Sequence, residues 1–212
     1  MGDQQGQSAG HLVSPLLPPP APTRTLKANE GPLVWIDCEM TGLDPRTERI
    51  IEIACIITDG QLNELDEGVT YVIKQDKAVL DAMGEWCTRQ HGQSGLTAAC
   101  LSAQALAHAD VRAAILTYVK ERIPQARVAC LAGNTVHADA AFLKGEMPEL
   151  MQHLHYRIVD VSTIKELVSR WYGPQSRWQG GKGEHRALED IRGSIAELRH
   201  YREEHFIPKL FN

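Results

Sequence analysis

Long apolar runs are missing from this 212-residue sequence, and so are paired cysteines. No apolar stretch approaches the ~20 residues that a membrane-spanning helix needs. The five cysteines are odd in number, scattered and without a CxxC pair, which argues against a disulfide framework or a cysteine-rich zinc site. We therefore expect reduced thiols and a protein that works in a reducing compartment.

An excess of positive charge is also missing. The net charge is −5, from 22 Lys and Arg against 27 Asp and Glu. This balance argues against a long nucleic-acid groove, which usually needs a basic face. It does not exclude a small site whose positive charge comes from bound metal. With 43% hydrophobic and 23% charged residues, the composition is typical of a globular protein.

Residues 1–31 lack the periodicity of a helix or a strand and are rich in Pro, Ala and Gly. We interpret them as a disordered tail, and residues 32–212 as one domain. The tail has no charged region followed by a continuous apolar stretch, so a secretory signal is not expected. Arg24 and Lys27, with few acids around them, leave a mitochondrial location open as the alternative to a cytoplasmic one.

The rest of the chain alternates between predicted strands and predicted helices. Three strands come first and read as an antiparallel meander; two further strands are each followed by helical segments. This order predicts an α/β fold, a mixed five-stranded sheet covered by helices. The predicted strands are 33–40, 49–58, 68–74, 127–133 and 155–161, and the predicted helices are about 78–87, 102–122, 138–152, 162–171 and 186–204.

Two carboxylates interrupt the first of these strands, in the segment WIDCEM at 35–40. Side chains alternate along a strand, so Asp37 and Glu39 project from the same face, roughly 6.5–7 Å apart along the backbone. Asp139 opens a helix after the fourth strand, in GNTVHADAAFL, and Asp190 lies in the last helix, in HRALEDIRGSIAEL. His185 precedes Asp190 by five residues.

Four carboxylates gathered in one place would repel each other unless a positive charge lay between them. Mg²⁺ or Mn²⁺ supplies that charge and prefers oxygen ligands, and a two-metal site suits displacement at phosphorus. His185 can then take the proton of the attacking water. Each residue alone has a structural explanation, such as an ion pair for the DxE segment or a helix N-cap for Asp139. The set, in this order, is far more specific than any member.

Three segments carry a resemblance to a known family. WIDCEMTGLD, AGNTVHADAAFL and HRALEDIRGSIAELRHYR resemble the three exonuclease motifs of the DEDD superfamily, in its histidine-bearing branch. HLHYRIVDVSTIKEL and MGEWCTRQHGQSGLT narrow the resemblance to the oligoribonuclease family, from about residue 33 to 207. It implies a ribonuclease H-like fold, a homodimer, two Mg²⁺ or Mn²⁺ ions, and 3′→5′ removal of nucleoside 5′-monophosphates from very short RNA, dinucleotides above all.

The resemblance also assigns roles to single residues. Leu43, in the loop after the first motif, matches a residue that wedges between the two 3′-terminal bases. Trp86 and His91 match residues lining the nucleotide site, and Met40 is also expected to bind substrate. Tyr156 matches an aromatic side chain contributed across the dimer interface. The residues that match a cap over the 5′-terminal phosphate are Thr135, Arg157, Ser162 and Thr163. Position 135 is commonly Ser in the family, so Thr keeps the hydroxyl and adds a methyl group. Residues 173–184 are assigned no role beyond mobility.

Three alternatives are weighed against this hypothesis. A proofreading or trimming exonuclease would share the acids but act on longer DNA or RNA, and would need an open groove in place of the cap. A nucleic-acid-binding module without activity would be favoured by loss of one acid, but all are present. A calcium-binding structural protein would need a ligand loop, whereas these acids come from distant segments.

Overall fold

The computed structural model describes residues 19–180 and 187–206. Its strands are β1 (Leu33–Met40), β2 (Ile50–Thr58), β3 (Val69–Val72), β4 (Cys130–Gly133) and β5 (Ile158–Asp160). Its α-helices are α1 (Lys77–Asp81), α2 (Glu85–Gln93), α3 (Leu96–Leu101), α4 (His108–Arg122), α5 (His137–Glu146), α6 (Pro148–His153), α7 (Val161–Tyr172) and α8 (Ala187–His205). Two short 3-10 helices, η1 (Ala28–Glu30) and η2 (Pro174–Ser176), complete the described elements.

The five strands form one sheet in the order β3-β2-β1-β4-β5. The first three pair antiparallel, with Asp37 of β1 opposite Ala54 of β2, while β4 pairs parallel with β1 and β5 parallel with β4. The predicted mixed sheet, a three-stranded meander followed by two further strands, is therefore confirmed. The first strand has become central because both halves of the sheet pair with it.

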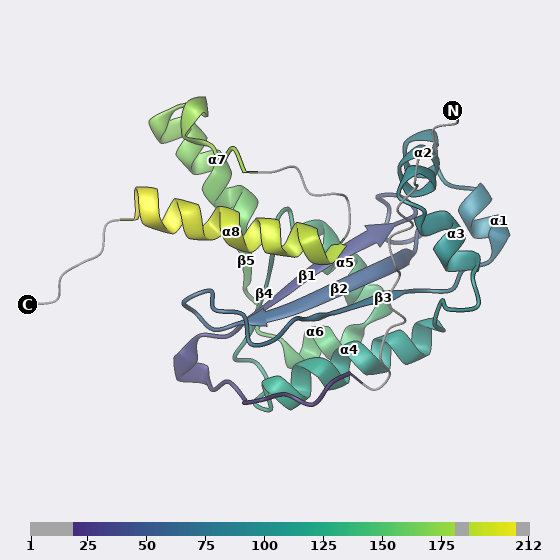
Figure 1. Ribbon diagram of the computed structural model, residues 1–212, viewed down its shortest axis with the longest axis horizontal. Coiled ribbons are helices and arrows are strands. Elements are labelled where there is room, and N and C mark those ends of the chain that lie inside the picture. The colour runs from purple at the N-terminus through teal and green to yellow at the C-terminus, as the bar shows by residue number, and fades with distance from the viewer. Residues whose placement is uncertain (1–18, 181–186, 207–212) are drawn as a thin grey trace, which may run out of the picture.

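Helices cover both faces of the sheet, with α4 and α6 on one side and α7 and α8 on the other (Figure 1). Along β1, Val34, Ile36 and Cys38 belong to the core under α4, whereas Trp35 belongs to the core under α8. Each buried aliphatic side chain of this size contributes about 1.5–3 kcal/mol. Since alternate residues share a face, the odd-numbered carboxylates of β1 lie on the side of α8.

Two predicted helices are each divided in the structure. The segment 78–87 holds α1 and the start of α2, separated at Gly84, whose extended backbone precedes α2. The segment 138–152 is divided at Met147, and Pro148 opens α6. Proline removes a backbone N–H and clashes with the preceding turn, so one continuous helix through this position was the wrong prediction. The short helix α3 was not predicted, and α4 begins at His108 instead of about 102.

The prediction of a disordered tail over 1–31 is wrong for residues 19–31, while residues 1–18 lie outside the described part. Leu26 is 1% exposed, and its N–H donates to the carbonyl of Arg122 at 2.7 Å. The buried Arg122 guanidinium donates to the carbonyl of Pro20 at 2.8 Å and pairs with Asp66. The buried side chain of Leu26 and a few hydrogen bonds to backbone groups hold this segment on the domain. No periodic pattern of apolar residues in the sequence signals such contacts.

Candidate active site

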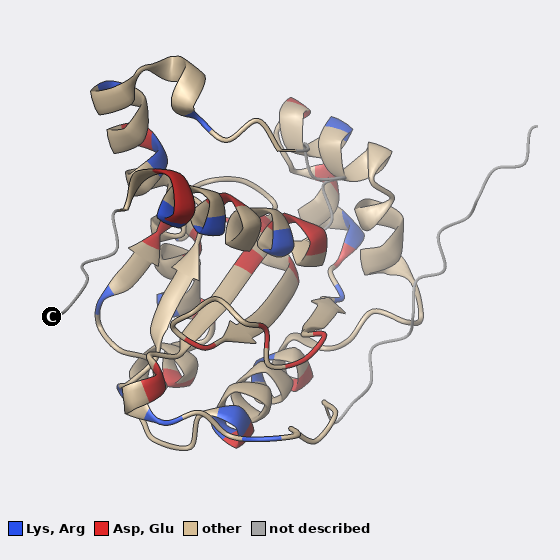
Figure 2. Ribbon diagram, turned by 60° about the vertical axis from the view of Figure 1, so that its left-hand side comes forward, with Lys and Arg blue, Asp and Glu red and all other residues tan. Residues whose placement is uncertain are grey.

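Three carboxylates meet where β1 passes beneath the first turn of α8. Asp37, Glu39 and Asp190 each offer an oxygen within 4.8 Å of the others. The first two share the face of Trp35, and Ile191 and Ile195 of α8 are buried in the same core as Trp35. Packing of α8 on the sheet thus places Asp190 above the two strand acids. Figure 2 shows acidic segments both on α8 and on the strands beneath it.

Asp139 reaches the same strand from the other half of the sheet. It lies in the first turn of α5, and its Oδ1 accepts a hydrogen bond from the N–H of Cys38 at 3.0 Å. That N–H belongs to the residue between Asp37 and Glu39. Gly133 at the end of β4 suits this close packing, because a Cβ there would lie 3.0 Å from both the carbonyl oxygen of Ile36 and the Cγ2 of Val136, the residue before α5. All four predicted acids are therefore gathered around the carboxyl end of β1.

Burial and mutual repulsion make these carboxylates hard to ionise. Burial, followed by Asp139 and Glu39, raises the pKa of Asp37 well above its ordinary value. Burial, followed by Glu52 and Asp190, raises the pKa of Glu39 to about 7. Burial also raises the pKa of Asp139 to about 6, although its hydrogen bond from Cys38 acts in the opposite direction. A nearby cation would remove this penalty.

The donor set fits hard divalent cations. Three carboxylate oxygens converge within 4.8 Å from two elements, and a fourth carboxylate is fixed beside them. Oxygen ligands of this kind are the ones that Mg²⁺ and Mn²⁺ prefer. Glu52 lies opposite Glu39 in the register of β1 and β2 and is buried, with the Thr70 hydroxyl 3.4 Å away. It adds negative charge behind the site.

The loop after β1 holds Leu43 out into solvent, where 85% of the residue is exposed. The buried hydroxyl of Thr41 donates to Glu48 at the far end of the loop and accepts from the N–H of Arg49. The N–H of Glu48 in turn donates to the carbonyl of Asp44. Because these hydrogen bonds hold the loop in one conformation, Leu43 stays exposed, where it can contact a ligand and does not pack into the core.

Of the two predicted nucleotide-site residues on α2, one faces solvent and one is buried. Trp86 is 62% exposed. His91 is buried, and its Nε2 bonds the carbonyl of Met40 at 2.9 Å, so this nitrogen carries the hydrogen. Its Nδ1 lies 3.8 Å from Glu39. In this structure His91 supports Met40 and Glu39 from behind, and its contact with a nucleotide stays a prediction.

Three of the predicted cap residues, Thr135, Ser162 and Thr163, lie where β4 and β5 end, whereas Arg157 lies just before the start of β5. The hydroxyls of Thr135 and Ser162 are 2.9 Å apart. Asp160 joins them, because its Oδ1 accepts from the N–H groups of both residues, at 2.9 and 3.0 Å. Thr163 follows on the first turn of α7 and is exposed. Arg157 is exposed, with its guanidinium 4.8 Å from the ring centre of Tyr156.

Tyr156 itself points away from the domain, is exposed and stacks on His155. His185 lies in the segment 181–186, outside the described residues, as does part of the loop 173–184. Its role therefore stays a prediction from the sequence.

Sequence reasoning missed three polar residues that support the cap. They are Asn134, which accepts from Ser162, Asp160, and Glu197 of α8, which accepts from Asn134. Asp160 had a usable signal, since an Asp before a helix with Ser two positions later is a typical N-cap. The other two had none, because nothing local in the sequence relates a helix glutamate to an asparagine 63 positions earlier.

Residues 34–198 match the exonuclease family. The chain is 53% identical over 171 residues to a probable oligoribonuclease of Schizosaccharomyces pombe, which covers 81% of this chain and 67% of that protein. It is 48% identical to the oligoribonuclease of Halorhodospira halophila, over 83% of this chain and 95% of that one. The chain belongs to the oligoribonuclease family. This membership confirms the resemblance carried by the three motifs, and the protein is an exonuclease-family enzyme.

Similar folds occur among solved structures of exonuclease I. One, described as suggesting how processivity is achieved, superposes with a TM-score of 0.64 at 15% identity, over 82% of this chain and 41% of that one. Another, from Methylocaldum szegediense, has a TM-score of 0.61 at 22% identity over 82% of this chain and 41% of the other. The chain thus spans about two fifths of those proteins. The likeness confirms the ribonuclease H-like fold.

Proposed function

We propose that this chain is a 3′→5′ exoribonuclease that releases nucleoside 5′-monophosphates from very short RNA, with dinucleotides as the preferred substrate. Membership of the oligoribonuclease family supports the class of reaction. The observation that carries the length preference is the pairing of two features. These are an apolar side chain, Leu43, held out in the loop after β1, and a pair of hydroxyls, Thr135 and Ser162, 2.9 Å apart beyond the ends of β4 and β5.

The four carboxylates Asp37, Glu39, Asp139 and Asp190 would hold two divalent cations, Mg²⁺ or Mn²⁺. Such ions activate water for attack at phosphorus and neutralise the charge that develops on the leaving oxygen. The acids would fix the positions of the ions, because the acids themselves are held on three different elements, β1, α5 and α8. His185, five residues before Asp190, would accept the proton of the attacking water, a role that suits a side chain titrating near neutrality.

Leu43 would separate the two terminal bases, with Met40, Trp86 and His91 forming the surroundings of the 3′ nucleotide. Thr135, Ser162, Thr163 and Arg157 would enclose a terminal phosphate beyond them. A terminal phosphate carries more charge than a bridging one, so hydroxyls and a guanidinium bind it selectively. A third nucleotide would clash with the enclosing residues. This arrangement needs no long basic track, which agrees with the net charge of −5.

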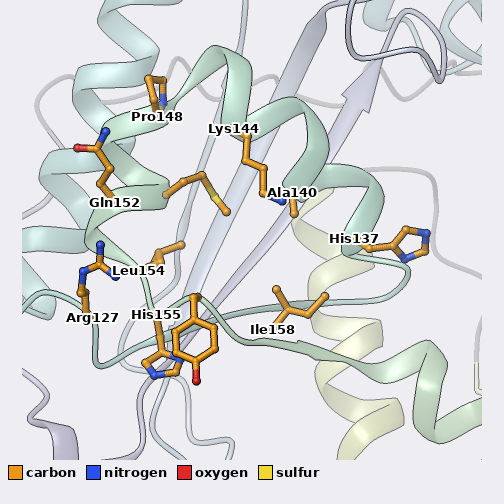
Figure 3. A pocket seen from close by; sticks show the side chains of 11 residues that line it. Arg127, His137, Ala140, Lys144, Pro148, Gln152, Leu154, His155 and Ile158 are labelled. Carbon is orange, nitrogen blue, oxygen red and sulfur yellow. The ribbon is translucent and has the colours of Figure 1, made fainter.

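A homodimer is part of the proposal. The sheet edge at β5 presents the exposed Tyr156 and Ile158. Beside them lies a cavity of about 610 Å³ (Figure 3). It is lined by Arg127, His137, Ala140, Lys144, Pro148, Met151, Gln152, Leu154, His155, Tyr156 and Ile158. An exposed tyrosine at an unpaired edge suits contact with a second copy of the chain, whose site it would enter.

The alternative is a trimming or proofreading exonuclease that acts on longer DNA or RNA. Measurement of kcat/KM distinguishes this alternative from the proposed function. The substrates are RNAs of two, four and eight nucleotides, each with a 5′-phosphate or a 5′-hydroxyl, and each is tested with Mg²⁺ and with EDTA. We expect the 5′-phosphorylated dinucleotide to be the best substrate and EDTA to abolish turnover. Equal rates on all lengths would contradict the cap and favour the alternative.

For location we propose the cytoplasm, with mitochondria as the alternative. A human relative, 48% identical over 84% of this chain, is a mitochondrial oligoribonuclease, which supports the alternative. Among the helices of residues 19–180 and 187–206, none is long and apolar enough to span a bilayer. Fractionation of cells that express the tagged full chain decides between the two compartments.

A further inference from the structure

The strands β1 and β2 contain a β-bulge directly beside the candidate active site. Their residues pair one to one as far as Glu39, one of the proposed metal ligands, but Met40 then lies opposite Ile50. Strand β2 therefore has one extra residue at this point, Ile51. A bulge bends its strand and redirects the chain that adjoins it. The loop 41–49 joins the two strands just beyond the bulge, so its position depends on how the bulge is held.

A side chain of α5 holds the backbone at this bulge. Ile50 is fully buried, where an N–H without an acceptor would be costly. Its N–H donates to Oε1 of Glu146, the last residue of α5, at 3.1 Å. The other oxygen, Oε2, lies 3.0 Å from Nε2 of His108 at the start of α4. The Glu146 side chain is only 15% exposed, so the bulge, α5 and α4 meet at one largely buried carboxylate.

Helix α5 is thus bonded to the meander at both of its ends. In its first turn Asp139 accepts from the N–H of Cys38 on β1, at 3.0 Å. In its last turn Glu146 accepts from the N–H of Ile50 on β2. These are the two strands that the loop 41–49 connects. Because one helix carries both acceptors, the position of the loop is set relative to a proposed metal ligand.

We propose that Glu146 is a positioning residue for substrate binding: by holding the bulge at Ile50, it places Leu43 correctly relative to the metal-binding acids. This inference rests on the proposed function and deepens it. Glu146 would act through the end of the loop and not by contact with the substrate. The start of the loop is held separately, because Nε2 of His91 donates to the carbonyl of Met40.

The test compares two substrates that share a phosphodiester bond and differ in the number of bases. One is a dinucleotide, and the other is the p-nitrophenyl ester of a nucleoside 5′-monophosphate, which has no second base for Leu43 to separate. Glu146→Ala should lower kcat/KM for the dinucleotide about tenfold, mainly through KM, which is close to what one hydrogen bond supplies. The ester should lose no more than about threefold. Equal losses on both substrates overturn the proposal, because they indicate a general disturbance of the site.

Two control variants separate the bond to Ile50 from the loss of a charge. Glu146→Gln keeps an oxygen that accepts from the N–H, so it should stay within about twofold of the parent on both substrates. Glu149→Ala is the matched control: it removes a carboxylate from the next helix, α6, where it pairs with Arg112 of α4 at the surface. It should also stay within about twofold. A tenfold loss in either control overturns the proposal.

Combination with Leu43→Ala tests whether the effect passes through the loop. Leu43→Ala alone should lower kcat/KM for the dinucleotide by about tenfold or more, because a large apolar contact is lost. If Glu146 acts by placing Leu43, adding Glu146→Ala to this variant should cost no more than about twofold further. Losses that multiply in the double variant overturn the proposal.

A measurement without substrate distinguishes failure of this proposal from failure of the proposed function. In NMR spectra of the full chain, the Ile50 amide should exchange with solvent at similar rates in the parent and in Glu146→Gln. In Glu146→Ala it should exchange at least about tenfold faster, while the amide of Ile36 in the central strand keeps its rate. Equal exchange of the Ile50 amide in the parent and in Glu146→Ala overturns the proposal. If exchange changes as expected but Leu43→Ala leaves dinucleotide turnover intact, the role of Leu43 in the proposed function is wrong, and this inference falls with it.

Discussion

At the residue scale, the candidate active site holds acids that repel each other, and this repulsion lowers the stability of the metal-free protein. Asp37, Glu39 and Asp190 lie within 4.8 Å, largely shielded from water, and nearby carboxylates raise the pKa of the first two. Buried like charges persist in a fold only where something else requires them. Here, binding of the proposed cations requires the acids.

Removing one acid should abolish turnover and keep the fold. We expect Asp190→Ala to lower kcat on a dinucleotide by at least about 10³-fold, because the site loses a ligand oxygen on which charge stabilisation depends. The melting temperature in EDTA should hold or rise, since one repelling charge is gone. Exposed Glu189→Ala, one position away on α8, is the control. Normal turnover by Asp190→Ala would contradict the metal assignment.

His185 should act in the chemical step. As a general base it is worth about 10²–10⁴-fold, so His185→Ala should lower kcat by that factor while KM changes little. Single-turnover rates at saturating dinucleotide measure it. A variant with normal kcat and a raised KM would assign the residue to binding.

The pH dependence of stability should report Glu39. Its pKa rises from 4.5 to about 7 on folding, so between these values the folded protein keeps a proton that the unfolded chain has lost. The free energy of unfolding of the metal-free protein therefore falls as pH rises through this window. Asp37 and Asp139 contribute to the same fall, since their pKa values are raised too. Glu39→Gln should remove the part that Glu39 contributes, giving a variant more stable than the parent by roughly 1–3 kcal/mol at about pH 8 and equal to it at about pH 4.

Urea unfolding in EDTA at the two pH values measures this difference. Repeating it with saturating Mg²⁺ should reverse the order, because the parent then gains binding energy that the variant lacks. The same pH dependence in parent and variant would show that Glu39 ionises freely.

At the element scale, the ends of strands and helices position the site. Asp139 sits in the first turn of α5, where the positive end of the helix dipole favours a carboxylate. Asp160 ends β5 and caps α7 by accepting from Ser162. These short junctions hold polar groups firmly because core packing fixes the elements on both sides.

The N-terminal segment is an element in its own right, and Leu26 tests that. Leu26→Ala should lower the free energy of unfolding by about 2–4 kcal/mol, the usual cost of emptying a buried leucine site. Leu101→Ala, at a half-exposed position of α3, should cost less than about 1 kcal/mol. Urea denaturation compares them. If both substitutions lowered the free energy of unfolding by the same small amount, residues 19–31 would not be packed on the domain in solution.

At the scale of the whole molecule, the proposed dimer decides whether each site is complete. A mixing experiment tests it with two variants, Tyr156→Ala, which is impaired, and Asp190→Ala, which is inactive. If the tyrosine acts across the interface, a mixed dimer has one site with all acids and an intact partner tyrosine. Its activity on a dinucleotide should then return to about half that of the parent per dimer. We expect Tyr156→Ala alone to lose about tenfold, as for removal of a stacked aromatic side chain. No recovery on mixing would place the tyrosine in its own site.

The sequence by itself determined the succession of strands and helices along the chain, the face shared by Asp37 and Glu39, and the set of acids. Each of these follows from local periodicity or from a motif whose spacing is set by the backbone. Only the tertiary structure decided that residues 19–31 pack on α4, that His91 lies behind Glu39, and that Glu197 of α8 accepts a hydrogen bond from Asn134. Such contacts join segments far apart in the chain, and they depend on how helices settle on the two faces of the sheet. No local pattern encodes them, because the free energy that selects them comes from packing the whole core.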